Sequence, residues 1–107
     1  MTKDYVIEPT NGSPALKFTG ELVASASSER NNSFKWTELE AYKTNGGKWV
    51  IVVIGAVNEG AEPHLKRLVE AHVFDANQTD RLTSKIGYGR LARKLYERMG
   101  INTVTID

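Results

Sequence analysis

The chain has 107 residues, of which 40% are hydrophobic and 25% charged, with a formal net charge of +1 and no cysteine. This balance is typical of one folded domain, and the lack of cysteine excludes disulfides, thiolate metal sites and thiol nucleophiles. No apolar run approaches the roughly 18 residues that span a bilayer, and no secretion signal begins the sequence, so we expect a cytoplasmic protein without a membrane partner.

The amino-terminal part of the sequence predicts an arm followed by a strand. Residues 1–15 contain a β-prone triplet, YVI, and then PTNGSP, whose prolines, glycine and asparagine indicate a turn. Residues 16–26 alternate apolar and polar side chains, which predicts a half-buried strand. We therefore expect an N-terminal arm at 1–15 and a single α+β domain at 16–107.

The centre of the sequence predicts a β-hairpin. Two segments rich in β-branched and aromatic residues, 34–44 and 48–57, flank Asn45-Gly46. Asn-Gly is the strongest short-range hairpin signal, because both residues accept the positive φ of a type I′ turn. Together with residues 16–26, the two segments would form a three-stranded antiparallel meander.

A two-residue loop predicts which side chains share a face of this hairpin. Tyr42 would lie opposite Trp49, and Leu39 opposite Val52. One face is then an ordinary apolar core, whereas the other combines large apolar groups with two carboxylates. Because Trp and Tyr dominate interface hot spots, we take the second face as a candidate partner-binding surface. Its residues are Trp36, Glu38, Glu40, Tyr42, Trp49 and Ile51, with Val53 beside them. The alternative is that the arm or a helix covers this face.

Two helices are predicted after the hairpin. In residues 63–74 apolar side chains recur at i, i+3, i+4, i+7 and i+8, with proline in the first turn. A second apolar stripe over 89–99 ends at Gly100, a usual C-terminal stop. Residues 80–86 suit a separate turn or short helix, and 103–106 would add an edge strand. We therefore expect an α+β fold, with a three- or four-stranded antiparallel meander and two helices packed on one face.

No catalytic constellation is evident in the sequence. His64 and His72 lie eight residues apart on one predicted helix, whereas a helical zinc-binding pair has the spacing i, i+4. Glu38 and Glu40 share a strand face, but the further ligands of a metal-dependent nuclease are missing. The G-x-G at 87–89 precedes a helix N-terminus and could hold an anion. The alternative is that these glycines only mark the break between two helical segments. We expect no metal and no cofactor and lean toward no enzymatic activity, while a catalytic site assembled from scattered residues stays open.

Positive charge is concentrated at the carboxyl end. Residues 77–107 carry six Lys or Arg and three Asp or Glu, a net charge of +3. Five of these cations could contact phosphates: Lys85, Arg90, Arg93, Lys94 and Arg98. The alternative is that they form the solvated face of an amphipathic helix.

Together these features predict a small non-catalytic protein-binding module that uses its aromatic sheet face to dimerise or to hold a protein partner. Such a chain suits an accessory or inhibitor protein, for example of a phage or another mobile element. The alternative function is nucleic-acid binding through the basic C-terminal helix.

Overall fold

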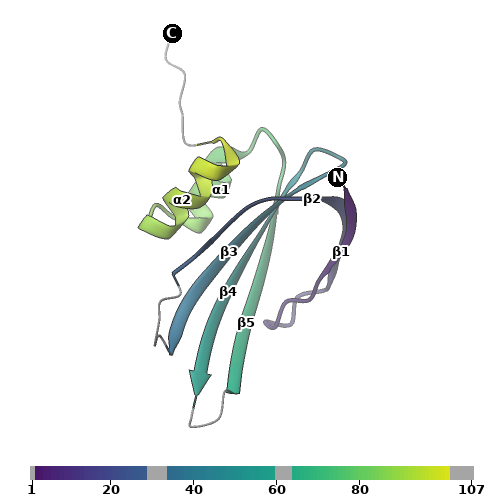
Figure 1. Ribbon diagram of the computed structural model, residues 1–107. Helices are drawn as coiled ribbons and strands as arrows, with labels where there is room; N and C mark the ends of the chain where they lie inside the picture. Colours follow the sequence, from purple (N-terminus) through teal and green to yellow (C-terminus); the bar gives the residue numbers. More distant parts are fainter. Residues whose placement is uncertain (1, 29–33, 60–63, 102–107) are drawn as a thin grey trace.

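A computed structural model describes residues 2–28, 34–59 and 64–101. Along these residues the elements are β1 Lys3–Ile7, β2 Leu16–Ser27, β3 Lys35–Thr44, β4 Trp49–Glu59, β5 His64–Phe74, α1 Thr79–Ile86 and α2 Arg90–Met99. The five strands form one antiparallel sheet in sequence order, and the two helices lie beside it (Figure 1). The α+β class and the antiparallel sheet are therefore confirmed, with five strands instead of three or four.

The prediction of a helix over 63–74 is wrong, because His64–Phe74 is strand β5. This segment pairs with β4 along its whole length, from Trp49 opposite Phe74 to Glu59 opposite His64. Its apolar residues fit an alternating pattern as well as a helical one. The choice is decided by β4, whose run WVIVVIGAV is apolar on both faces and is typical of a central strand with a neighbour on each edge.

The predicted register of the β3–β4 hairpin is wrong by one residue. The loop has three residues and ends in Gly47, which has the positive φ of 83° and donates its N–H to the carbonyl oxygen of Thr44. This is the three-residue loop that closes with a left-handed glycine. Trp49 therefore lies opposite Lys43 and not Tyr42. A shift of one residue moves every side chain of β4 to the other face relative to β3.

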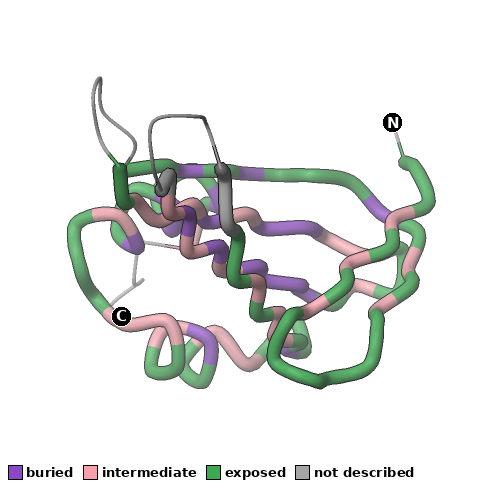
Figure 2. Tube along the Cα trace, turned by 90° about the horizontal axis from the view of Figure 1, so that it is seen from below, coloured by how far each residue is buried: buried purple, intermediate pink, exposed green. Residues whose placement is uncertain are grey.

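The sheet has an apolar core on each of its faces. One core joins the strands to both helices: Ala24, Ala26, Leu39, Ala41, Trp49, Ile51, Phe74, Leu82, Ala92, Leu95, Tyr96 and Met99. The other core contains Tyr42, Val50, Val52 and Ile54, and side chains of β1 and early β2 pack on it: Tyr5, Ile7, Leu16 and Phe18. Figure 2 shows the buried positions running along the strands, with the helices on one side.

The second core is enclosed because β2 changes its pairing partner midway. β1 pairs with residues 16–20 of β2, whereas β3 pairs with β2 from Gly20 onward, with a bulge between Leu22 and Ala24. Gly20 belongs to both pairings. The first half of β2 can therefore turn away from β3 and carry β1 over the sheet (Figure 1).

The two edges of the curled sheet meet at Thr10. Its N–H donates to the carbonyl oxygen of Val69 in β5 at 2.9 Å, and its Oγ1 accepts the Val69 N–H at 2.8 Å. The segment predicted to be an arm thus supplies both a paired strand and this contact with the opposite edge.

The carboxyl-terminal helices follow the sequence closely. The helix predicted over 89–99 is confirmed as α2, and it ends at Gly100 in the left-handed conformation, with φ 81°. The short helix expected near 80–86 is α1. Neither described helix is long and apolar enough to cross a membrane. The edge strand predicted at 103–106 lies outside the described residues.

Candidate functional site

The structure divides the predicted partner-binding residues between the two faces of the sheet. Trp49 and Ile51 lie under the helices and are 6% and 0% exposed. Tyr42 lies in the opposite core and is 6% exposed. The cause is the three-residue loop, which places the β4 residues Trp49 and Ile51 on the face away from Tyr42. Within the folded chain these three side chains are interior.

The other three predicted partner-binding residues lie half-buried on the face away from the helices: Trp36, Glu38 and Glu40. The indole Nε1 of Trp36 donates to Glu38 Oε2 at 2.8 Å, and Arg67 Nη2 donates to the same oxygen at 3.2 Å. Glu40 accepts the hydroxyl of Tyr42 at 3.1 Å. Burial, and then the charge of Glu40, raises the pKa of Tyr42 far above its ordinary value. These polar groups are engaged within the protein, and their role in partner binding stays a prediction.

Both histidines of the predicted helix 63–74, His64 and His72, belong instead to strand β5. His72 is half-buried, and its Nε2 lies 3.6 Å from Glu70 Oε2. Over 2–28, 34–59 and 64–101 no group of three or more His, Cys, Asp or Glu side chains is placed to hold a metal ion.

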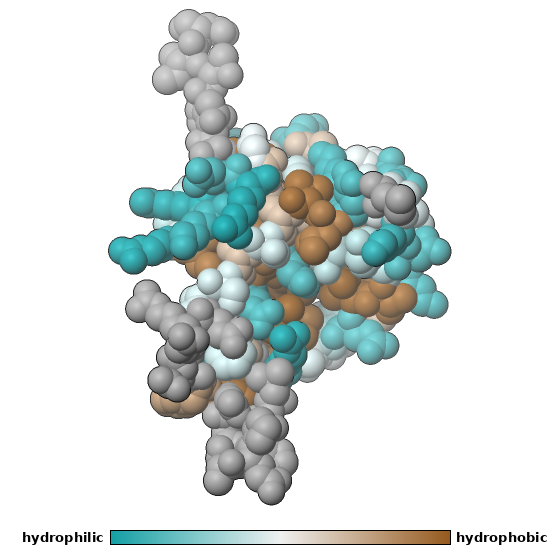
Figure 3. Space-filling model, viewed as in Figure 1, coloured by the Kyte–Doolittle hydropathy of each residue, from teal (hydrophilic) through white to brown (hydrophobic). Residues whose placement is uncertain are grey.

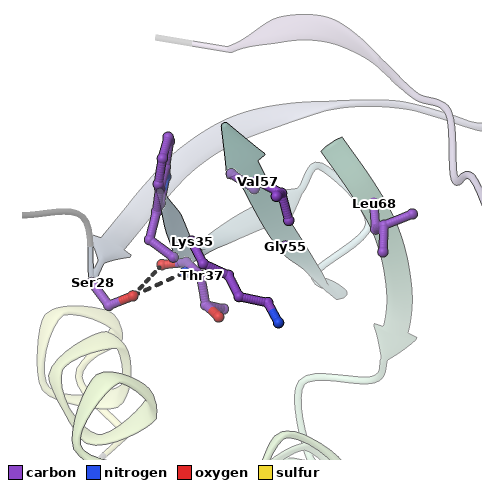
Figure 4. A pocket seen from close by; sticks show the side chains of 8 residues that line it. Ser28, Lys35, Thr37, Gly55, Val57 and Leu68 are labelled. Carbon is purple, nitrogen blue, oxygen red and sulfur yellow. Dashed lines mark hydrogen bonds between the residues drawn. The ribbon is translucent and has the colours of Figure 1, made fainter. Parts of the chain in front are cut away.

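A groove of about 380 Å³ lies on the helix-bearing face, next to the part that the helices cover. Its described lining residues are Ser28, Lys35, Trp36, Thr37, Gly55, Ala56, Val57 and Leu68. Trp36 and Ala56 belong to this lining although strand alternation directs their side chains to the opposite face. Figure 4 shows the side chains of Lys35, Thr37 and Leu68 around one open space. Ser28 Oγ accepts the N–H of Thr37 at 2.9 Å, so the hydroxyl is tied to the sheet. Among the described residues that line the groove, Lys35 is the one with a charged side chain.

The five predicted cations lie together on the two helices. Lys85 is in the last turn of α1, and the others belong to α2: Arg90, Arg93, Lys94 and Arg98. All five are exposed, and Figure 3 shows hydrophilic side chains extending from the helical part of the surface. Arg98 donates to the carbonyl oxygen of Ser25 in β2. Among the described residues no carboxylate lies within ion-pair distance of any of the five.

The charge of the helical segment is opposite to that of the rest of the chain. Residues 79–99 contain six Lys or Arg and two Asp or Glu, a net charge of +4, so the remaining residues carry −3. The first turn of α2 has no acidic residue to offset the positive end of the helix dipole. We call the surface formed by the five cations of α1 and α2 the cationic helix pair. A surface with this concentration of positive charge attracts anions.

Tyr88, in the turn between α1 and α2, is the surface residue that sequence reasoning missed. Its side chain is 64% exposed, and its hydroxyl donates to Thr83 Oγ1 at 3.0 Å. Its ring centroid lies 6.5 Å from that of Tyr96, with the rings at 74°. The Tyr96 hydroxyl donates to the carbonyl oxygen of Gly87. Burial, followed by the neighbouring Tyr88, raises the pKa of Tyr96 to about 12. The signal in the sequence was an aromatic residue between two cations, Lys85 and Arg90, at a helix break.

Comparison with known proteins gives no relative for this chain: no family model, no curated protein and no solved structure matches it.

Proposed function

We propose that the protein is a small non-catalytic binding module whose ligand is nucleic acid, held at its phosphates by the cationic helix pair. The observation that carries this proposal is the set of five exposed cations, none of them paired with a described carboxylate. Neutralisation of phosphates by Lys and Arg releases counterions and supplies most of the sequence-independent affinity for nucleic acid. The cations already project from one layer of the molecule, so binding there requires no rearrangement of the sheet.

A protein partner, including a second copy of the chain, is the other candidate. Three of the six residues expected to contact it are interior, which weakens the aromatic face as its docking surface. The groove beside Leu68, a side chain that is 57% exposed, supports this candidate instead. An accessory or inhibitor role would require such a partner.

Charge reversal on α2 tests the nucleic-acid proposal. Arg93→Glu with Lys94→Glu should weaken binding of labelled duplex DNA and single-stranded RNA at least about tenfold, because two phosphate contacts are lost. The slope of log affinity against log salt should fall in magnitude by roughly 1 to 2. Fluorescence anisotropy at low and near-physiological salt measures both quantities.

The matched control is Lys3→Glu with Lys17→Glu, which changes the net charge equally at exposed positions of β1 and β2. This control should retain most of the affinity. Equal weakening by both double variants would show that overall charge, and not the helix pair, sets the affinity. Absence of binding by the unmodified protein at low salt would reject the proposal outright.

A further inference from the structure

Tyr88 is exposed to solvent and yet held in one orientation. Its hydroxyl end is anchored on Thr83, and its ring makes an edge-to-face contact with Tyr96. An edge-to-face contact can occupy at most one face of the Tyr88 ring. With 64% of the residue exposed, an aromatic surface is open to a flat ligand.

The turn that carries this ring is fixed by its neighbours. Gly87 has a φ of 98°, a conformation that side-chain-bearing residues rarely adopt, and its N–H donates to the carbonyl oxygen of Thr83 at 2.8 Å. Its own carbonyl oxygen accepts the hydroxyl of the buried Tyr96. The ring is thus positioned before any ligand arrives, which reduces the entropy cost of binding to it.

Cations surround the turn on both sides in the sequence. Lys85 precedes Tyr88 by three residues and Arg90 follows it by two, and both are exposed. Proteins that bind single strands combine a cationic track for the backbone with aromatic side chains on which unpaired bases stack. In a duplex the faces of the bases are covered by their neighbours, so an exposed tyrosine adds little there.

We infer that the cationic helix pair binds single-stranded nucleic acid in preference to duplex, with a base stacked on the ring of Tyr88. This inference rests on the proposed function, because the phosphates that bring the base to Tyr88 are held by the same cations. Tyr88 supplies the preference for unpaired bases, while the cations supply affinity for any polyanion.

The test compares three labelled ligands with equal numbers of phosphates: an oligothymidylate, an abasic strand and a duplex. The unmodified protein should bind the oligothymidylate roughly five- to a hundredfold more tightly than the abasic strand, the range expected for one stacked base. Tyr88→Ala should lose that difference and leave abasic and duplex binding unchanged. Tyr88→Phe keeps the ring and should retain the preference. Circular dichroism and urea unfolding of both variants check that the turn still folds.

The outcomes separate this inference from the proposal on which it rests. Equal binding of oligothymidylate and abasic strand by the unmodified protein would overturn base stacking while leaving phosphate binding intact. A similar loss for all three ligands in Tyr88→Ala would show that the tyrosine acts through the fold of the turn, which also overturns stacking. Failure of the unmodified protein to bind any of the three would reject the proposed function itself.

Discussion

At Gly20 the backbone of β2 passes too close to β3 for any side chain. A Cβ at this position would lie 2.2 Å from the carbonyl oxygen of Lys43 and 2.9 Å from Cα of Thr44. Gly20 is also the last residue of β2 that pairs with β1, opposite Lys3. The close approach therefore occurs at the point where the sheet begins to curl.

Gly20→Ala should lower the free energy of unfolding by about 1–3 kcal/mol, because the added methyl group must displace the backbone of β3. Urea denaturation measures the change. Gly55→Ala is the matched control, since its Cβ would meet Leu68 Cβ at 4.0 Å, an ordinary contact. We expect a change within about 0.5 kcal/mol for the control. Equal destabilisation by both substitutions would contradict a special role for the Gly20 approach.

Among the elements, the two helices are joined by Tyr96. This residue of α2 is 4% exposed in the core beneath the helices, and its hydroxyl donates to the carbonyl oxygen of Gly87 between them. Burial, with the neighbouring Tyr88, raises its pKa to about 12. Since this folded-state pKa is above the ordinary value of about 10 for tyrosine, folding favours the neutral phenol.

The contribution of Tyr96 to stability should therefore be complete below pH 10 and be lost as the pH rises from about 10 toward 12. In Tyr96→Phe this loss is absent, so its free energy of unfolding should decline less than that of the unmodified protein over this range. At pH 7 the variant should be less stable by about 0.5–1.5 kcal/mol, because the Gly87 carbonyl loses its donor. Urea unfolding at pH 7, 9 and 11 measures both effects; parallel pH curves for the two proteins would refute the first.

At the scale of the whole molecule, the sheet encloses its second core by bringing its edges together at Thr10 and Val69. The contact joins positions 59 residues apart in the chain. Closing so long a loop costs conformational entropy, and the packing of β1 and early β2 on the second core offsets that cost. The curl also leaves the helices on the other face, where their cations remain exposed.

Thr10→Val should increase the hydrogen exchange rate of the Val69 amide, because Oγ1 is its acceptor, and lower the stability by about 1 kcal/mol. Hydrogen exchange monitored by NMR measures the first effect. The control, Thr19→Val, removes an exposed bond to Asp4 Oδ1 of 2.6 Å and should leave exchange at Val69 unchanged. Unchanged exchange at Val69 in Thr10→Val would show that the contact does not protect the β5 edge.

Features that depend on neighbouring residues were predictable. Helix α2 and its end at Gly100 followed from the apolar period and the glycine, and the strand over 16–26 from its alternation. The grouping of cations on the helices followed for the same reason, because the helical period sends them to the side opposite the apolar stripe. The exposure of Tyr88 did not follow, since it depends on how the turn packs against Tyr96.

Features that depend on distant contacts were not predictable. The pattern of residues 64–74 suits a helix and a strand equally. The strand forms because β4 would otherwise have an unpaired edge, and residues 64–74 pair with it. The residues of the predicted aromatic face lie on two different faces because the left-handed residue of the hairpin loop is Gly47, although Asn45-Gly46 carries the stronger local signal. Strand side chains alternate with a period of two. The one additional loop residue therefore places Trp49 and Ile51 beneath the helices. Pairing partners and register are set by the free energy of the whole sheet. This free energy depends on contacts between distant residues, so it cannot be read from a short stretch of sequence.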